Sequence, residues 1–208
     1  MALTKAIAAV DEWAEVSAGA LREGATTDIT AMYEAQLHID VSLAEATAET
    51  VGATIIVQVS SNTTGDTDWS PLTSFGGPTG TAISKALGGT EAVGQTVLTV
   101  ADPVTANLNH HGKLLFIEHT TPASSEIVYS VADSGDAGDT ITIQDGLTTE
   151  QTAAASTIWS IDGAASAVAQ YVVALPMSTN RVRVIYDNIL ATGADIFSRC
   201  RISKVTAV

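Results

Sequence analysis

The stretch QLHIDVSL, residues 36–43, decides the fold class. Leu37, Ile39, Val41 and Leu43 alternate with His38, Asp40 and Ser42. This period of two is typical of a β-strand with one buried and one polar face, because successive side chains of a strand point to opposite sides. The stretch therefore predicts a strand at the surface of a β-sheet core.

Strand and turn signals recur on both sides of this stretch. TIIVQVSS, residues 54–61, reads as another strand, and the following NTTGDTDW, residues 62–69, reads as a turn because of its Asn, Gly and Asp. Strands resume near the C-terminus with QYVVAL, RVRVIY and DIFSRCRISKV. Repeated short strands separated by turns are typical of sandwiches and barrels. We predict an all-β protein built on an antiparallel β-sandwich, Ig-like or jelly-roll-like.

The glycine-rich segment FGGPTGT, residues 75–81, interrupts this rhythm. Shorter strands are expected after it, at 96–100, 113–118, 126–131, 140–143 and 157–161, and a small-residue stretch at 162–167 follows them. We therefore predict a sandwich made from residues 1–78 and 164–208, with a small β-barrel-like module inserted at 79–163.

The N-terminal segment, about residues 1–17, has two possible structures. Leu3, Ile7, Val10 and Ala14 recur at helical spacing, whereas Trp13 and Val16 fit a strand. We describe this segment as a short N-terminal arm and leave its conformation open.

Composition restricts the partners. The 208 residues carry a formal net charge of −14, and with four basic and 21 acidic residues positions 1–180 have a net charge of −17. Nucleic acid and anionic membranes are therefore not expected as partners. The lone Cys200 cannot form an internal disulfide, and MALTKAIAAVDEW is too short in apolar residues for a signal-peptide core. We expect assembly in a reducing cytoplasm.

The last 28 positions, 181–208, differ from the rest because five basic and two acidic residues give them a net charge of +3. The basic residues are Arg181, Arg183, Arg199, Arg201 and Lys204. We predict a β-hairpin that carries arginines at period two on both strands. Either Glu34, Asp40 or other carboxylates of the same domain pair with them, or they form an interface with acidic surface on another subunit.

No motif for catalysis, a metal or a cofactor stands out. Adjacent His110 and His111 would point in opposite directions, so at most one of them can join His119. Asp133, Asp136 and Asp139 lack the spacing of a calcium loop, and the glycine-rich segments lack a phosphate-binding ending. Cys200 reads as a structural cysteine. We expect a protein that is not an enzyme and needs no cofactor or metal.

Three stretches of the outer segments, residues 33–47, 55–75 and 171–207, resemble small β-sandwich structural proteins of tailed bacteriophages, especially head decoration (capsid cement) proteins. The middle block, through GQTVLTV, GDTITIQDGLTT and AAASTIWSID, resembles a β module that recurs in phage structural proteins, although Asp145 stands where a basic residue is common.

This resemblance implies a virion component without catalytic residues. We expect it to decorate and stabilise the capsid surface as a homo-oligomer, contacting major capsid protein and neighbouring copies of itself after assembly in the bacterial cytoplasm. The alternatives are a tail or head-tail connector subunit, and a carbohydrate-binding sandwich in which Trp69 or Trp159 stacks on a sugar.

Overall fold

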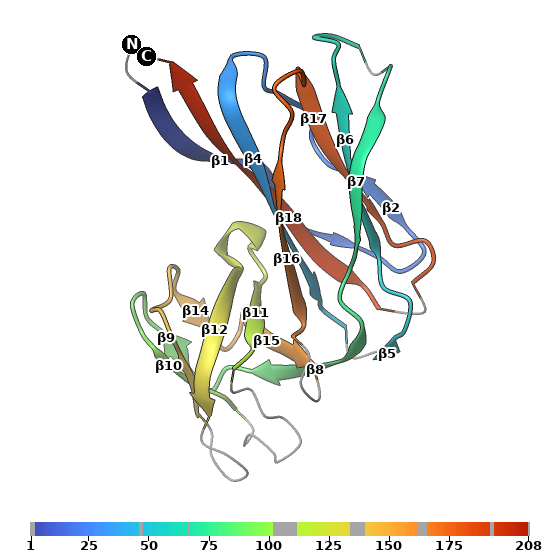
Figure 1. Ribbon diagram of the computed structural model, residues 1–208. Helices are drawn as coiled ribbons and strands as arrows, with labels where there is room; N and C mark the ends of the chain where they lie inside the picture. Colours follow the sequence, from blue (N-terminus) through green and yellow to red (C-terminus); the bar gives the residue numbers. More distant parts are fainter. Residues whose placement is uncertain are drawn as a thin grey trace.

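The computed structural model describes residues 3–45, 48–65, 67–101, 112–133, 140–161, 166–191 and 194–207. Its strands pair antiparallel throughout, and the one helical element among these residues is the 3-10 turn Pro122–Ser124. The expected all-β antiparallel sandwich is confirmed (Figure 1). No helix in this described part of the chain is long and apolar enough to span a membrane.

The sandwich has two layers. Sheet A has the strand order β1-β18-β4-β16, and sheet B has the order β2-β17-β6-β7, with β3 also paired to β17. The strands of sheet A are β1 (Leu3–Val16), β18 (Ile196–Ala207), β4 (Met32–Leu43) and β16 (Val168–Ala174). Those of sheet B are β2 (Leu21–Glu23), β17 (Arg181–Asp187), β6 (Thr54–Ser60), β7 (Ser70–Gly76) and β3 (Thr27–Asp28).

The opening stretch lies in β4 and behaves as its period predicts. Leu37, Ile39, Val41 and Leu43 are completely buried in the core of the sandwich. The inward residues of β17 are Val182, Val184 and Tyr186, which are also fully buried. The alternate residues of β4 lie on the outer face of sheet A, and this places Asp40 and His38 away from the core.

The middle of the chain forms a separate layer, the module sheet, with strand order β10-β13-β12-β11-β15-β8-β5 and a small β14-β9 ladder beside it. All five strands expected there are present. The bounds are β5 (Ala48–Glu49), β8 (Gly80–Ala86), β9 (Thr90–Glu91), β10 (Val97–Thr99), β11 (Leu114–His119), β12 (Glu126–Asp133), β13 (Thr140–Ile143), β14 (Gln151–Thr152) and β15 (Ser156–Ile161). The described strands form an open sheet, with β10 and β5 at its edges. The prediction that the module is barrel-like is therefore wrong.

The module sheet buries both of its faces. On β11, Leu115 and Ile117 belong to a second apolar core that lies within the module, whereas Phe116 points to the opposite face and packs against residues of sheet A. The ring centroid of Phe116 lies 4.5 Å from that of Trp13 and 5.7 Å from that of Phe197. Aromatic packing therefore joins the module to the outer face of sheet A. The division at residues 78/79 and 163/164 stays a prediction, since residues 162–165 lie outside the described part.

The N-terminal segment is the long edge strand β1, so the helical alternative is wrong. It pairs with β18 from Leu3↔Ala207 to Val16↔Ile196. Its register shifts between Ala9 and Asp11 and again between Asp11 and Ala14. Each irregularity changes which side a residue faces. This explains why the apolar residues of the segment do not alternate strictly.

The predicted C-terminal hairpin is wrong. β17 and β18 are not paired with each other, because β17 lies between β2 and β6 in sheet B, whereas β18 lies between β1 and β4 in sheet A. The buried side chain of Asn188 stabilises the crossing between the layers by donating to the carbonyl oxygens of Val16 at 3.0 Å and Ala194 at 3.1 Å. Two strands with alternating residues have the same sequence pattern whether they form a hairpin or lie in different sheets, so the sequence could not distinguish the two arrangements.

Candidate functional site: a charged cleft and an apolar end

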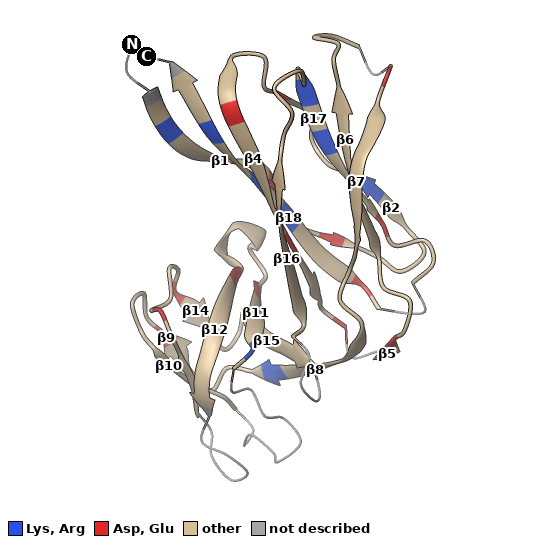
Figure 2. Ribbon diagram, viewed as in Figure 1, with Lys and Arg blue, Asp and Glu red and all other residues tan. Residues whose placement is uncertain are grey.

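The five basic residues lie on different layers of the sandwich. Arg181 and Arg183 point outward from sheet B, and Arg199 and Arg201 point outward from sheet A. Figure 2 shows the basic positions of β17 and β18 on separate strands of separate layers. Lys204, partly exposed, lies opposite Ala6 and Ala35 near the end of β18. The structure therefore does not bring these residues together in one ladder.

On sheet A, two arginines share one carboxylate. Arg199 Nε donates to Asp40 Oδ2 at 2.8 Å, and Arg201 Nη2 donates to the same oxygen at 3.2 Å. Gln170 Nε2 donates to the other oxygen, Oδ1, at 2.9 Å. The guanidinium of Arg199 also lies 4.7 Å from the ring centroid of Trp13. The prediction of a carboxylate partner within the domain is confirmed for Asp40, and the network reaches across all four strands of sheet A.

On sheet B, the arginines pack on an aromatic ring. The guanidinium carbons of Arg181 and Arg183 lie 5.0 and 4.5 Å from the ring centroid of Trp69, a geometry for cation–π attraction. Arg183 also donates to Glu23 Oε2 at 3.1 Å and to Gln58 Oε1 at 2.8 Å. Four of the five residues predicted to form an interface thus have partners within the chain. Their role at an interface stays a prediction.

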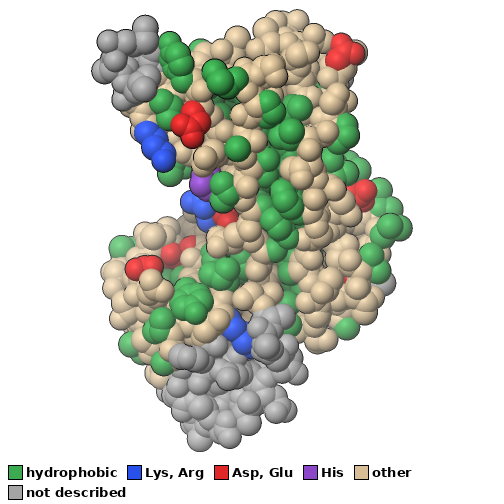
Figure 3. Space-filling model, in the orientation of Figure 1, with side chains coloured by type: hydrophobic (Ala, Val, Ile, Leu, Met, Phe, Trp, Pro, Cys, Tyr) green, Lys and Arg blue, Asp and Glu red, His purple; other side chains and the backbone are tan. Residues whose placement is uncertain are grey.

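A cleft of about 430 Å³ separates the outer face of sheet A from the module. Arg199, Arg201 and Gln170 line one wall, and Glu126, Tyr129 and Asp145 are among the residues on the module side. Figure 3 shows the molecule hollowed between its two lobes, with basic, acidic and histidine side chains at the inner end of the hollow. Walls of opposite charge are the main feature of this cleft.

The carboxylate of Glu126 organises the module side of the cleft. It accepts from the backbone N–H and the hydroxyl of Thr148 at 2.9 and 2.7 Å, from the hydroxyl of Thr149 at 3.0 Å and from Gln151 Nε2 at 2.9 Å. Buried carboxylates need such donors to offset the loss of water. Glu126 therefore fixes Thr148 and Thr149, the last two residues of the block GDTITIQDGLTT.

The other sites considered from the sequence have structural partners or lie outside the described residues. Trp159 is buried, and its Nε1 donates to Glu118 Oε2 at 2.7 Å. His119 Nδ1 accepts from the N–H of Thr121 at 2.8 Å. His110, His111, Asp136, Asp139 and the side chain of Asp133 are not described. Elsewhere in the described chain, no group of three His, Cys, Asp or Glu is arranged to hold a metal ion.

Cys200 faces the core between the sheets and is completely buried. Burial, reinforced by the negative charges of Asp11 and Asp40, raises the pKa of its thiol far above the usual range. The neighbouring arginines point to the opposite face of β18, so they do not create a thiolate. This arrangement supports the structural role that the sequence indicated.

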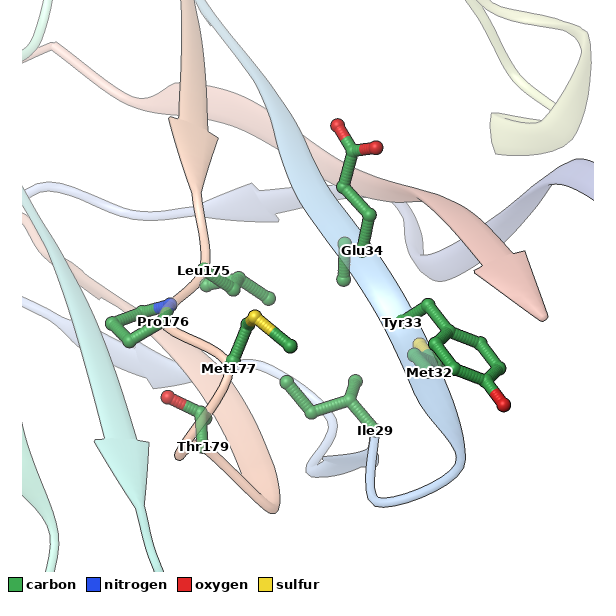
Figure 4. A pocket seen from close by; sticks show the side chains of 9 residues that line it. Ile29, Met32, Tyr33, Glu34, Leu175, Pro176, Met177 and Thr179 are labelled. Atoms are coloured by element: carbon green, nitrogen blue, oxygen red, sulfur yellow. The ribbon is translucent and has the colours of Figure 1, made fainter.

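An apolar end of the sandwich was not anticipated from the sequence. The start of β4 and the loop after β16 place Met32, Tyr33, Leu175, Pro176 and Met177 around a pocket of about 20 Å³ (Figure 4). Met177 is 88% exposed and Tyr33 is 50% exposed. This pocket has room for about one water molecule, and Met32, Tyr33 and Met177 also border a wider hollow of about 480 Å³ on the same surface. The signal in the sequence was the uncharged run of residues 163–180.

The comparisons with known proteins find only distant likeness. No family model matches the chain, and no curated protein matches it significantly. Among solved structures, the K3 adhesin domain of Lys-gingipain from Porphyromonas gingivalis matches with a TM-score of 0.33 and 12% identity over 90% of this chain, and this chain spans 63% of that domain. VP17, a capsid protein of bacteriophage P23-77, matches with a TM-score of 0.21 and 10% identity over the whole of both chains.

A third likeness is to infectious bursal disease virus, Gx strain, with a TM-score of 0.24 and 6% identity over all of this chain and 42% of that one. The weak structural neighbours thus include viral capsid proteins and bacterial adhesin domains. At these TM-scores the likeness does not reach a shared overall fold, and it identifies no function.

Proposed function

We propose that this chain is a non-enzymatic structural protein of a virion, and more specifically that it decorates the head of a tailed bacteriophage by binding major capsid protein. The resemblance of residues 33–47, 55–75 and 171–207 to phage decoration proteins supports this role. The charged groups around the cleft also support it, because Arg199, Arg201 and Glu126 are bonded to partners within the chain, as side chains with a structural role are.

The observation that carries the proposal is the apolar end. Large apolar side chains on a protein surface mark sites of protein contact when they gather in one place, as Tyr33, Pro176 and Met177 do here. The module lies at the other end of sheet A (Figure 1), where its Phe116 packs against Phe197, whose partner on β4 is Ser42. In this arrangement the apolar end docks on the capsid surface and the module projects outward.

Whether one of the five basic residues can contact the capsid depends on how far its side chain is exposed. Arg199 is held between Trp13 and Asp40, whereas 39% of the side chain of Arg201 is exposed. Replacing both arginines by glutamate would place new carboxylates beside Asp40 and disturb folding. Lys204→Glu is the cleaner test of a contact with acidic capsid surface, because Lys204 lies opposite two alanines.

The experiment measures binding of the purified protein to capsids assembled without it, by co-sedimentation and electron microscopy. We expect the wild type to bind. The double variant Tyr33→Asp/Met177→Asp should bind with an affinity reduced by at least about tenfold, since it loses two apolar contacts. Leu190→Asp is the matched control, because Leu190 is 75% exposed in the loop at the opposite end of the sandwich. Failure of the wild type to bind, or equal binding by the double variant, would contradict the proposal.

A further inference from the structure

The sheets of the described molecule end in strands that differ in how their free edges are protected. A free edge presents unpaired backbone groups that can pair with another chain, and proteins block such edges with charges, prolines, bulges or short strands. β1 has two register irregularities and carries Lys5, Asp11, Glu12 and Glu15; β7 contains Pro71 and a bulge; β2, β3, β5 and β10 have two or three residues. β16, seven residues long, has none of these features.

The backbone of β16 faces two ways. Leu175 N–H donates to Ala35 O at 3.0 Å, and Leu43 N–H donates to Ala167 O at 3.0 Å, so the odd-numbered residues bond to β4. Backbone groups alternate in direction along an antiparallel strand. The N–H and C=O groups of Val168, Gln170, Val172 and Ala174 therefore point away from β4, and no backbone hydrogen bond among the described residues occupies them.

The side chains beside this edge leave it accessible from Gln170 to Ala174. Val172 is 63% exposed, and Gln170 and Ala174 are also exposed, whereas the side chain of Val168, at the start of the strand, is buried. Figure 3 shows a stripe of hydrophobic side chains running over the part of the surface where Figure 1 places β16. An accessible, uncharged and regular edge is the type that accepts an added strand.

We propose that β16 pairs antiparallel with β16 of a second copy of this chain across a two-fold axis, which joins the two copies of sheet A into one continuous sheet. In this register Val168 lies opposite Ala174 of the second copy, and Gln170 lies opposite Val172 of the second copy. Each opposed pair exchanges two backbone hydrogen bonds, so all four outward-facing residues of each strand are used.

The charge pattern favours a second copy as the occupant. In a two-fold antiparallel pairing, a charge near the axis lies close to the same charge on the second copy, and this repulsion is destabilising. Residues 163–180 contain no charged side chain, although the chain has a net charge of −14. The register also sets a larger residue against a smaller one at Val168 and Ala174. β16 thus avoids the repulsion that self-pairing of a charged strand such as β1 would produce.

The pairing has the strength of a weak dimer. A single seven-residue ladder buries less than the ~800 Å² per partner of a standard stable interface. The dimer therefore forms as concentration rises, and on a surface that holds many copies it adds to other contacts. This dimer would be one way in which neighbouring copies contact each other on the capsid, and in that respect it rests on the proposed function. Its test uses the isolated protein, so it can succeed or fail whether or not the protein belongs to a virion.

The first test is hydrogen exchange of the wild-type full chain over a range of concentrations, read residue by residue by NMR. We expect the amides of Val168, Gln170, Val172 and Ala174 to become protected as concentration rises, whereas the amides of Ala169, Tyr171 and Val173 are protected throughout by β4. Protection that does not change with concentration, or that rises equally at other exposed edges, overturns the proposal.

The second test compares two lysine variants by analytical ultracentrifugation. Val172→Lys and Ile7→Lys replace residues that are 63% and 65% exposed, on the two opposite edge strands of sheet A. We expect Val172→Lys to raise the dimer dissociation constant about tenfold or more and Ile7→Lys to leave it unchanged. Val172→Pro, which removes an outward N–H, repeats the test without charge. Equal association of both lysine variants, or a monomeric wild type at all concentrations, overturns self-pairing.

Discussion

Asp40 Oδ2 accepts a hydrogen bond from Arg199 Nε at 2.8 Å, on the face of β4 that points away from the core. Asp40 is only 2% exposed, and Gln170, Arg199 and Arg201 all donate to its carboxylate. A carboxylate in this position needs its cationic partners, and the arginines in turn need it. The cluster of basic residues in the last positions of the chain thus has a structural use on sheet A.

Asp40→Asn should lower the free energy of unfolding by roughly 2–3 kcal/mol, because two guanidinium groups lose their shared carboxylate. Chemical denaturation measures the change. Glu23→Gln is the matched control, since Glu23 pairs with Arg183 at 3.1 Å but has a side chain that is 57% exposed, and we expect it to cost less than about 1 kcal/mol. Equal losses for the two variants would contradict the role of Asp40.

Trp69→Ala should lower the free energy of unfolding by about 1–2 kcal/mol, because Arg181 and Arg183 lose the ring on which they pack. Trp69→Phe keeps a ring and should recover part of the loss. The same variants test the carbohydrate alternative on a glycan array. Wild-type glycan binding that disappears in Trp69→Ala without a loss of stability would favour sugar stacking over packing.

Gly146→Ala should destabilise the module by roughly 1–3 kcal/mol, as overpacking does. A Cβ atom at Gly146 would lie 2.5 Å from the carbonyl oxygen of Gly94, whose N–H is held by Leu147 O at 2.8 Å. Thermal unfolding followed by calorimetry measures the effect. Gly89→Ala is the control, because a Cβ at Gly89 meets no atom within 4 Å and this variant should behave as wild type.

Cys200 should make stability fall at alkaline pH. Its pKa is raised in the folded state by burial, so its contribution is complete below the ordinary thiol pKa of 9.0 and is lost as pH rises above that value. Tyr186, whose pKa is also raised by burial, adds to the loss at higher pH. The decline in melting temperature above pH 9.0 should be shallower in Cys200→Ala. An unchanged slope, or rapid thiol labelling of the native protein, would contradict this account.

The alternation of Leu37, Ile39, Val41 and Leu43 was enough to predict a strand, because it shows which residues of the strand are buried. The recurrence of such strands and of turns along the chain predicted the all-β sandwich. Strand partners could not be predicted in the same way. β17 and β18 each alternate correctly, yet pairing depends on contacts with β6 and β4, far away in the sequence. In β1 the two register shifts near Asp11 change which residues face the core. The apolar residues therefore do not alternate along the whole strand, and their spacing resembled that of a helix.

The candidate sites were predictable to a smaller extent. Asp40 could be named among the partners of the arginines because it lies on the polar side of an alternating strand. The sharing of its carboxylate by Arg199, Arg201 and Gln170 depends on three strands meeting in one sheet. The apolar end and the edge of β16 were missed, since solvent exposure of Met177 or Val172 follows from the fold and not from hydropathy.

The pairing of Leu3 with Ala207, and of Thr206 with Met32, brings both chain ends beside the apolar end of the sandwich (Figure 1). Any polypeptide fused to either terminus would emerge next to Tyr33, where it would obstruct access sterically. Affinity tags and fluorescent reporters are therefore better carried by the module, for example near Gly89, where they point away from that surface. A cleavable terminal tag would report the obstruction directly, through binding that returns once the tag is removed.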